Sequence, residues 1–362
     1  MTCAGPAESD INVHRGTGLV SNAFNEPIMA ALKGNVGIGH TRYSTTGGSE
    51  NVQMAQPFIV HTSYGVIAVA HNGELVNSKT LRQKILDKGV GLSTGSDSEL
   101  ITQCLSMKPP ERFRNPTELD MNKLNLSSTR KTTRTGKQLQ FADGFTDPET
   151  PPVNEDPVLP NSHKLSHEDK ELELLSRLLH LMSLTPLSYA LIVMYDECLY
   201  AIRDPFGNRP LCIGMLFTAP VDGGPRASRE KLSIDGWVVS SESCSFPSVS
   251  ARHWRDIEPG EIVKLERNKL PKTLALLPRP DPAMAPAFCI FEHVYFARPD
   301  SLFDGQMVYT VRVKCGMKLA IEASIPIPAD NALTHEVVVA PVPETSIPAA
   351  LGFAQQVCFT PS

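Results

Sequence analysis

The chain has 362 residues, of which 41% are hydrophobic and 20% charged, and this composition suits a globular protein of about two domains. A net charge of −5 disfavours a general nucleic-acid-binding surface, and no apolar run approaches the roughly 18 residues that a membrane-spanning helix needs. The eight cysteines are widely spaced and the first residues do not form a secretory signal, so the sequence predicts a cytoplasmic protein with buried thiols.

The amino-terminal third of the chain is predicted to alternate between short strands and helices. The apolar run at 66–70 is typical of a buried strand, and it leads into Asn72-Gly73, a dipeptide that often forms a two-residue hairpin turn. The next residues instead predict a helix, with Ser78 as its cap and Gly89 as its stop. The dipeptide is therefore predicted to lie between a strand and a helix. At this point a turn and a binding site remain equally open.

Residues 107–165 differ in character from the rest of the chain. They are polar, rich in proline and poor in periodic apolar residues, so they cannot bury enough surface to offset the entropy lost on ordering. The segment is predicted to be a disordered insertion or a long loop. Its basic cluster at 130–137 is interpreted as part of a solvated linker, with a docking or localisation patch as the alternative.

Regular structure is predicted to resume at a capping box formed by Ser166 and Asp169, followed by leucines at helical spacing. Strand-like segments then follow at 188–195, 198–204, 210–216, 236–243 and 261–267. This order predicts layered α+β packing with antiparallel sheets. Within 336–354 the sequence predicts a buried strand, a loop and the start of a helix. These elements are too few for an independent domain, so they are expected to open a domain whose remainder the sequence lacks.

Three short stretches carry chemical groups that suit one ligand. Arg42 follows a glycine-rich strand, and arginine binds carboxylates through a planar bidentate fork. Asn72 and Gly73 offer a side-chain amide and a backbone N–H, which together can hold an oxyanion. Asp97, at the start of a predicted helix, offers an anion for an amine. Together these groups predict a site for an amino acid with a reacting carbonyl.

Each of these residues also has a purely structural interpretation. Arg42 could be a buried ion-pair partner, and Asn72-Gly73 could be a turn. Asp97 could simply complement the positive end of the helix dipole, as acidic residues in first turns usually do.

Three motifs resemble the glutamine site of the class II glutamine amidotransferases, which are N-terminal nucleophile hydrolases: GHTRYSTTG, HNGELVN and STGSDSEL. The resemblance narrows to the amidophosphoribosyltransferase family at RDPFGNRPLCIG and above all at FCIFEHVYFARPDS. It covers residues 14–106 and 166–356. It implies the first step of de novo purine synthesis, in which glutamine, phosphoribosyl pyrophosphate and water give 5-phosphoribosylamine, glutamate and pyrophosphate.

The family resemblance also implies a domain organisation. Residues 10–270 are expected to form a glutamine amidotransferase domain with the four-layer αββα sandwich of the N-terminal nucleophile hydrolases. Residues 271–362 are expected to form a linker and the first strand and helix of an incomplete phosphoribosyltransferase domain.

The resemblance further assigns a role to each candidate residue. Asn72 and Gly73 correspond to the oxyanion hole. Arg42 and Thr45 correspond to residues that hold the region of the glutamine α-carboxylate, and Asp97 corresponds to the partner of the α-amino group.

The resemblance implies two cofactors for full-length members of the family, a [4Fe–4S] cluster and Mg²⁺. Cys289 falls where many members place one thiolate ligand of the cluster, which is normally held by four cysteines. Because the other ligands would lie beyond Ser362, this chain is expected to bind neither cofactor completely. The resemblance also implies glutamine as a ligand and a homo-oligomer as the assembly, with no nucleic acid or membrane as a partner.

The sequence departs from the family pattern in its nucleophile. The family uses an amino-terminal cysteine followed by Gly-Val-x-Gly, whose free amine is the base, whereas Cys3 here is preceded by two residues and followed by Ala-Gly-Pro. The acidic strand and Gly/Thr-rich loop that would bind phosphoribosyl pyrophosphate are also missing. The chain is therefore expected to be an inactive form, truncated at both ends, that binds glutamine weakly. The alternative is a non-catalytic protein that associates with full-length subunits.

Overall fold

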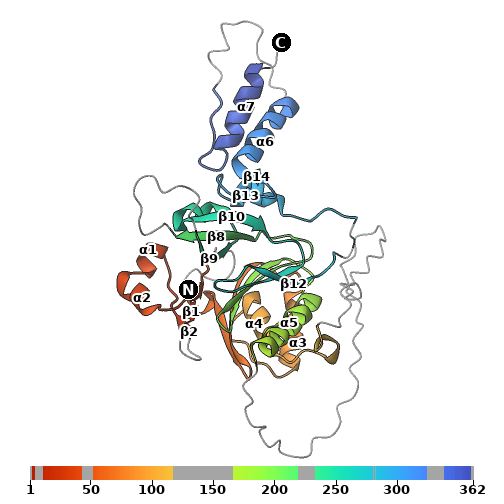
Figure 1. Cartoon of the computed structure of the whole chain (residues 1–362). Coiled ribbons are helices and arrows are strands. Elements are labelled where there is room, and N and C mark those ends of the chain that lie inside the picture. Colours follow the sequence, from red (N-terminus) through yellow and green to blue (C-terminus); the bar gives the residue numbers. More distant parts are fainter. Residues whose placement is uncertain are drawn as a thin grey trace, which may run out of the picture.

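An antiparallel sheet of six strands organises the molecule (Figure 1), in the order β12-β11-β7-β6-β5-β4. The computed structural model describes residues 2–4, 11–42, 52–116, 166–218, 233–279, 281, 283–323 and 338–359, with only the backbone of 2–4, 218, 233 and 358–359. The six strands are β4 (Phe58–Thr62), β5 (Gly65–Gly73), β6 (Tyr189–Tyr195), β7 (Cys198–Arg203), β11 (Glu261–Leu265) and β12 (Lys272–Leu276). β5 pairs directly with β6, and Val69 lies opposite Val193. The segments on either side of the expected insertion therefore share one sheet.

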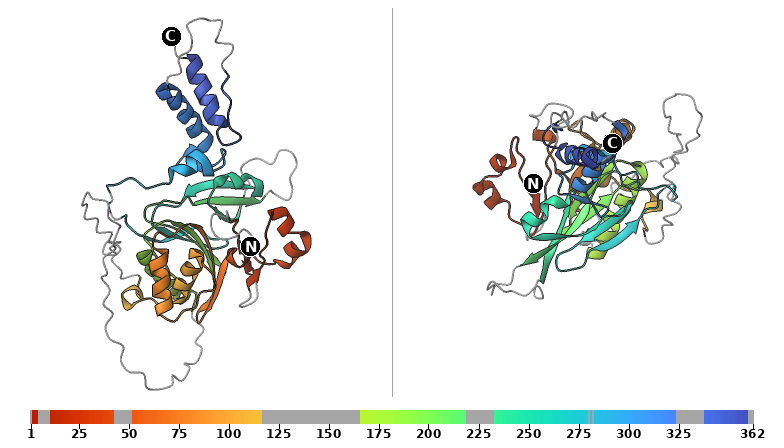
Figure 2. Two further views of the ribbon diagram at one scale, coloured as in Figure 1. Left: turned by 180° about the vertical axis from the view of Figure 1, so that it is seen from behind. Right: turned by 90° about the horizontal axis from the view of Figure 1, so that it is seen from above.

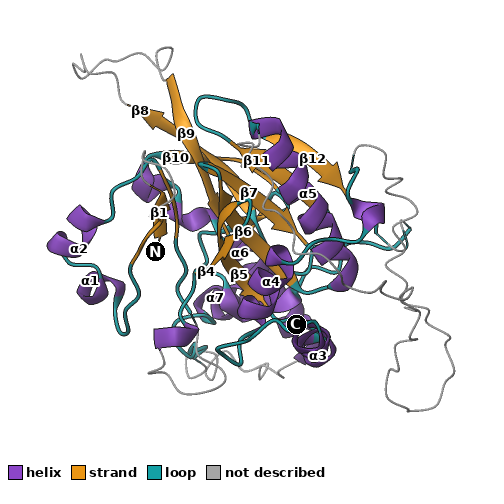
Figure 3. Ribbon diagram, turned by 90° about the horizontal axis from the view of Figure 1, so that it is seen from below, coloured by secondary structure: helices purple, strands orange, loops and turns teal. Residues whose placement is uncertain are grey.

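Three helices cover one face of this sheet: α3 (Ser78–Asp87), α4 (Asp97–Ser106) and α5 (His167–Leu184). Figure 3 shows these helices on one side of the sheet and the smaller sheets on the other. α5 begins at the predicted capping box, in which the Ser166 hydroxyl accepts the Asp169 N–H and the Asp169 carboxylate accepts the Ser166 N–H. α3 begins at Ser78, but Asn77 occupies the N-cap position and makes no side-chain cap.

Two three-stranded sheets cover the opposite face of the large sheet. One has the order β10-β8-β9 and the other β2-β1-β3. Their strands are β1 (Thr2–Ala4), β2 (Ile11–Val13), β3 (Val36–Ile38), β8 (Cys212–Thr218), β9 (Ser233–Ser240) and β10 (Ala251–Asp256). Alternation along the large sheet explains the layering, because in β5 Ile67 and Val69 point to the helices while Ala68 and Ala70 point to the small sheets. The short alanine side chains let the two sheet layers approach closely.

Short elements surround these layers. Beside the β2-β1-β3 sheet lie α1 (Val20–Ala23) and α2 (Glu26–Ala31) (Figure 2). Single helical turns are η1 (Val52–Met54), η2 (Glu111–Phe113), η5 (Ser243–Ser245), η6 (Pro247–Val249) and the π-helical η7 (Glu292–Phe296). The hairpin of β13 (Leu302–Phe303) and β14 (Gln306–Met307) leads into α6 (Val308–Ala323), which pairs with α7 (Ile347–Phe359).

The helix pair α6 and α7 projects away from the sheets (Figures 1 and 2). The two backbones meet at glycines, because a Cβ atom on Gly316 would lie 1.8 Å from the carbonyl oxygen of Ala349. A Cβ atom on Gly352 would likewise lie 2.0 Å from the carbonyl oxygen of Val313. The pair thus depends on close approach at two small residues.

Two sequence expectations are corrected within the described residues. The buried strand expected within 336–354 is absent from residues 338–342, where Val338 and Val342 are 82% and 79% exposed. A valine-rich run forms a strand only where a neighbouring strand pairs with it, and none does so in the described part of the chain.

The first ten residues of the insertion expected at 107–165 are ordered, with Phe113 fully buried against His180; residues 117–165 lie outside the described ranges. No described helix has the length and apolar character needed to cross a membrane.

Candidate functional site

A cavity of about 840 Å³ opens where β5 ends. Its walls come from the residues after β3, the end of β5, the first turns of α3 and α4, and the segment 239–245. Four of the predicted site residues line it together: Arg42, Asn72, Gly73 and Asp97. Thr45 lies outside the described residues, so its position stays a prediction.

Asn72 and Gly73 are the last two residues of β5, where they lie opposite Ala190 and Tyr189 of β6. The connection to α3 begins at Glu74, and the dipeptide does not form a hairpin turn. The Asn72 side-chain amide is held at both ends. Its Nδ2 donates to Ser241 Oγ at 3.1 Å, and its Oδ1 accepts from Arg209 Nη2 at 3.3 Å. Because arginine is only a donor, this contact fixes which end of the amide is the oxygen and leaves the NH₂ group to donate.

The backbone at Gly73 has a conformation that favours glycine, with φ of +138°. A Cβ atom there would lie 2.1 Å from the carbonyl oxygen of Ser188, closer than real Cβ atoms come. That oxygen also accepts a hydrogen bond from the Glu74 N–H at 3.0 Å. The end of β5 is therefore pressed against the residue that leads into β6.

Arg209 links this amide to a distant part of the chain. Its Nη2 lies 2.8 Å from Glu292 Oε1 in an ion pair, and Glu292 is 3% exposed. Burial raises the pKa of the Glu292 carboxyl, although the Arg209 charge opposes the rise. Arg209 and Glu292 lie in the sequence motifs quoted above. Nothing in those motifs indicated that Glu292 would pair with Arg209, or that Arg209 would contact Asn72.

Asp97 begins α4, and Ser96 caps this helix by accepting a hydrogen bond from the Ser98 N–H at 3.2 Å. Asp97 Oδ2 accepts from the Leu75 N–H at 2.9 Å, and its side chain is 20% exposed. The carboxylate is thus held in place between α4 and the β5–α3 connection, with part of its surface open to the cavity. Glu99 instead accepts the N–H groups of Ser93 and Thr94, and so shapes the preceding loop.

Two histidines at the cavity were not identified from the sequence. Gln56 binds the backbone of His71 on both sides, since its Oε1 accepts the His71 N–H at 2.6 Å and its Nε2 donates to the His71 carbonyl at 3.0 Å. Burial, followed by the nearby His71, lowers the pKa of His40 to about 4. Burial also lowers the pKa of His71, although Asp97 lies 3.8 Å away and opposes this. Both rings are therefore neutral at neutral pH, so neither histidine offsets the negative charge of Asp97.

The described cysteines do not fit the expected iron–sulfur cluster. A [4Fe–4S] cluster needs four thiolates close together. Cys289 is half-buried and unpaired, and it is not part of the one metal-ligand group that the described residues contain. Cys244 lines the cavity, and burial raises the pKa of its thiol, so it is not an activated nucleophile.

Comparisons with known proteins identify a matching domain model and similar enzymes. Residues 40–115 match a model of the glutamine amidotransferase domain. Amidophosphoribosyltransferases of Drosophila melanogaster, Mus musculus and Homo sapiens are 44%, 43% and 41% identical to it over 98% of the chain. The chain is therefore similar to amidophosphoribosyltransferases over nearly its whole length. It spans about half the length of these curated relatives, covering 52%, 55% and 55% of them.

Solved structures support the same assignment. A Bacillus subtilis glutamine phosphoribosylpyrophosphate amidotransferase in complex with ADP and GMP is similar over 99% of this chain, with a TM-score of 0.63 and 26% identity. This chain covers 57% of that one. A second structure, described as the allosteric regulatory enzyme of purine biosynthesis, gives a TM-score of 0.64 at 26% identity over 98% of this chain and 56% of its own. The segment that matches the glutamine amidotransferase model, 40–115, contains all four predicted residues that line the cavity.

Proposed function

We propose that this chain carries the glutamine-binding part of an amidophosphoribosyltransferase. Members of that family catalyse the first step of purine synthesis, and the substrates implied for the whole enzyme are glutamine and phosphoribosyl pyrophosphate. The observation that carries the proposal is chemical complementarity in one cavity. A cation at Arg42, an anion at Asp97 and neutral N–H donors at Asn72 and Gly73 are the groups that a bound glutamine requires.

The proposed mode of binding assigns one group to each part of the ligand. Arg42 pairs with the α-carboxylate through its planar fork, with Thr45 beside it, and Asp97 accepts the α-ammonium group. The Asn72 amide NH₂ and the Gly73 backbone N–H point toward the side-chain carbonyl, where negative charge develops as a nucleophile attacks. The contact from Arg209 supports this role, because it keeps the amide oxygen turned away from that position.

The described cysteines support binding more readily than turnover. Among the side chains that the structure describes, Cys244 is the cysteine in the cavity, and burial holds its pKa above the usual range. Ground-state recognition and bond breaking use different groups, so the site can hold glutamine without cleaving it. We therefore propose glutamine binding without glutaminase or phosphoribosyltransferase activity for this chain. The alternative of a non-catalytic subunit partner has no observation in its favour.

We propose the following domain organisation. Residues 10–270 form a glutamine amidotransferase domain of the four-layer αββα type, and the large sheet shared by both segments supports this. Residues 271–362 form a linker and the opening of the phosphoribosyltransferase part. The [4Fe–4S] cluster, Mg²⁺ and the homo-oligomer are proposed for the family and are not assigned to the described residues. The unpaired state of the six cysteines with described side chains supports a reducing, cytoplasmic location.

The proposal is tested by calorimetric titration of the purified chain with L-glutamine. The Arg42→Gln and Asp97→Asn variants should each weaken binding at least tenfold, because each leaves one charge of the ligand without its partner. Arg82→Gln is the matched control: Arg82 also lines the cavity, but it donates to the Thr94 carbonyl. Unchanged binding in Arg42→Gln and Asp97→Asn would rule out the proposed site.

A ligand series separates the two charges. The analogue of glutamine that lacks the α-amino group should bind wild type and Asp97→Asn equally, since it has no ammonium for Asp97 to accept. If Asp97→Asn weakens that analogue as strongly as it weakens glutamine, the assignment of Asp97 is wrong. Release of glutamate that disappears in Cys3→Ala would contradict the proposed absence of turnover.

A further inference from the structure

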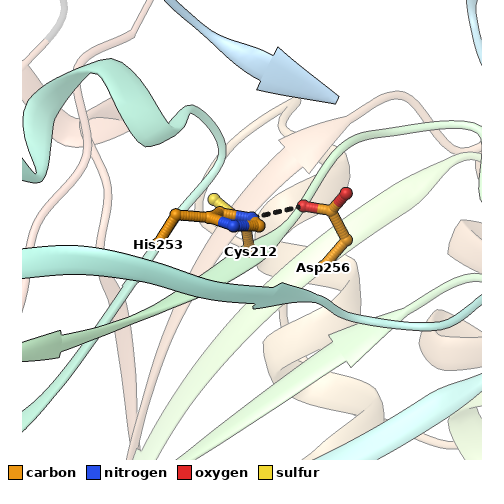
Figure 4. Close-up of side chains that lie close together, drawn as sticks. All are labelled: Cys212, His253 and Asp256. Atoms are coloured by element: carbon orange, nitrogen blue, oxygen red, sulfur yellow. Dashed lines mark hydrogen bonds and ion pairs between the residues drawn. The ribbon is translucent and has the colours of Figure 1, made fainter. Parts of the chain in front are cut away.

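Away from the cavity, one group of described side chains brings together a thiol, an imidazole and a carboxylate. It consists of Cys212, His253 and Asp256, drawn in Figure 4. One potential ligand atom of each residue lies within 4.8 Å of those of the other two. The three residues come from the neighbouring strands β8 and β10, and none of them lines the glutamine cavity.

A β-bulge places the three side chains on one face of the small sheet. His253 and Asp256 are three positions apart, so in a regular strand they would point to opposite faces. The register of β10 shifts after His253, which lies opposite Gly214, whereas Asp256 lies opposite Cys212. Cys212 and Gly214 are two positions apart in β8, so they share a face of the sheet. The extra residue in β10 therefore brings the side chains of both His253 and Asp256 to that face. Bulges that re-aim a side chain are common next to functional sites.

The bulge creates a site with a closed floor and an open rim. Cys212 is 2% exposed, and its thiol donates to the Ser240 carbonyl at 3.3 Å. The side chains of His253 and Asp256 are 24% and 23% exposed, and His253 Nε2 lies 3.0 Å from Asp256 Oδ1. The second oxygen, Oδ2, accepts the N–H of Asp304 at 2.9 Å. An ion can therefore reach the imidazole and the carboxylate from solvent and then meet the sulfur beneath them.

The same three residue types occur in nucleophilic triads, but the geometry here differs. In a triad the imidazole accepts the proton of the thiol, whereas here the thiol donates to a backbone carbonyl. Burial, followed by the nearby Asp256 carboxylate, raises the pKa of the Cys212 thiol. A buried, protonated thiol without access to substrate does not act as a nucleophile.

We propose that Cys212, His253 and Asp256 bind a zinc ion, with water as the fourth ligand. Zinc takes thiolate, imidazole and carboxylate ligands in a tetrahedral arrangement, and this mixture suits it better than Mg²⁺ or Ca²⁺, which prefer oxygen ligands. Bonds of about 2.0–2.3 Å place neighbouring ligand atoms roughly 3.5 Å apart around the metal. The three ligand atoms lie within 4.8 Å of one another, so on binding the sulfur moves toward the other two, while the His253–Asp256 contact, at 3.0 Å, opens slightly. Small side-chain rotations allow both changes.

Charge balance is consistent with a divalent ion. On binding, the Cys212 sulfur forms a bond to zinc and its proton goes to solvent, while His253 binds through Nε2 with its ring N–H at Nδ1 and so gives up its contact with Asp256. One thiolate and one carboxylate then neutralise the two charges of the ion. The His253 ring is already oriented by stacking on Phe246, at 6.4 Å between ring centres and an interplanar angle of 29°.

The test uses the full chain, purified without an affinity tag and stripped of metal by a chelator. Zinc is titrated in competition with a chromogenic chelator, and Co²⁺ is added separately as a spectroscopic probe of sulfur ligation. One equivalent of zinc should bind per chain, and Co²⁺ should give a sulfur-to-cobalt charge-transfer band. His253→Phe, which preserves the ring stacked on Phe246, should weaken zinc at least tenfold, and Cys212→Ser should also abolish the band.

Cys198→Ser is the matched control, since Cys198 is a buried cysteine of β7 that is not part of the metal-ligand group. It should leave both the zinc affinity and the cobalt band unchanged. Zinc that binds no better than to the competing chelator would overturn the proposal. So would a zinc affinity that is the same in wild type and His253→Phe, a partly exposed position whose substitution is expected to leave the fold intact.

Discussion

Substitution of Gly73 by alanine tests how tightly the end of β5 is held. The backbone conformation, at φ of +138°, costs a residue with a side chain about 1–3 kcal/mol. The new Cβ atom would also meet the Ser188 carbonyl oxygen at 2.1 Å, and moving that backbone adds about 1–3 kcal/mol as in other overpacked sites. Loss of the Glu74 hydrogen bond to the same oxygen adds about 1 kcal/mol. The free energy of unfolding should therefore fall by at least about 3 kcal/mol.

Two other glycines separate these causes. Gly89 has φ of +75°, but a Cβ atom added there would have no other atom within 4 Å, so Gly89→Ala should lose only the conformational cost of about 1–2 kcal/mol. Gly91 has neither feature, and Gly91→Ala should be neutral or slightly stabilising. Urea denaturation of the three variants and wild type measures the differences. If Gly73→Ala and Gly89→Ala destabilise by the same amount, the close approach of β5 to Ser188 is refuted.

Three further predictions concern the helices that cover the large sheet. Arg177→Lys should lower the free energy of unfolding by about 2–4 kcal/mol, as measured by urea denaturation. The reason is that Arg177 donates to the carbonyls of Leu105 and Ser106 at the end of α4 while its guanidinium stacks on the Tyr64 ring. Burial lowers the pKa of His180 to about 4. Between about pH 6.5 and 4 the unfolded chain therefore binds a proton at this histidine and the folded chain does not. His180 alone should lower the free energy of unfolding between about pH 6.5 and 4 by up to about 3 kcal/mol, so the fall should be smaller by that amount in His180→Phe. Ser166→Ala should cost about 1 kcal/mol through the lost capping box, whereas an equal stability would show that the cap contributes nothing.

Local signals in the sequence predicted elements whose ends depend on local chemistry. The capping box at Ser166 and the stop at Gly89, which has the positive φ of a helix end, were confirmed because each uses side chains or backbone within one turn. The helix predicted after Asn72-Gly73 was also confirmed, as α3, although the dipeptide itself ends β5 and is not part of the connection. A helical pattern after the dipeptide outweighed the turn preference of the dipeptide itself.

The strands β10 and β12 were not predicted, and both lack a local signal. β10 reads Ala-Arg-His-Trp-Arg-Asp, and only Ala251 in it is fully buried, so no apolar alternation marks it. β12 lies at the edge of the large sheet, with only Ala275 fully buried. These strands form because β8 and β11 offer them paired backbone groups. That information is held in the neighbouring strands and not in their own residues.

The valine-rich run within 336–354 shows the reverse error. Its composition predicts a buried strand, yet Val338 is 82% exposed. β propensity measures how well a residue fits a paired and half-buried surface, and the described part of the chain provides no such surface there.

The site shows the same division between local and distant information. Arg42, Asn72 and Asp97 lie within short motifs, so the sequence predicted which groups would face a ligand. The residues that hold them come from elsewhere: Arg209 fixes the Asn72 amide, and Glu292 holds Arg209. Neither pairing has a sequence signal, because each depends on how strands far apart in the chain are aligned.

The boundary of the functional unit follows from these contacts. The family match at 40–115 contains the groups that would touch glutamine, but the backbone of Gly73 is fixed by Ser188 and the Asn72 amide by Ser241 and Arg209. A fragment limited to 40–115 would keep the ligand-facing groups and lose every one of these supports. It would also expose the edge of β5 that pairs with β6. The smallest unit able to hold the site in this geometry therefore includes both segments of the large sheet, and the ion pair to Glu292 extends it into the segment that leads to α6.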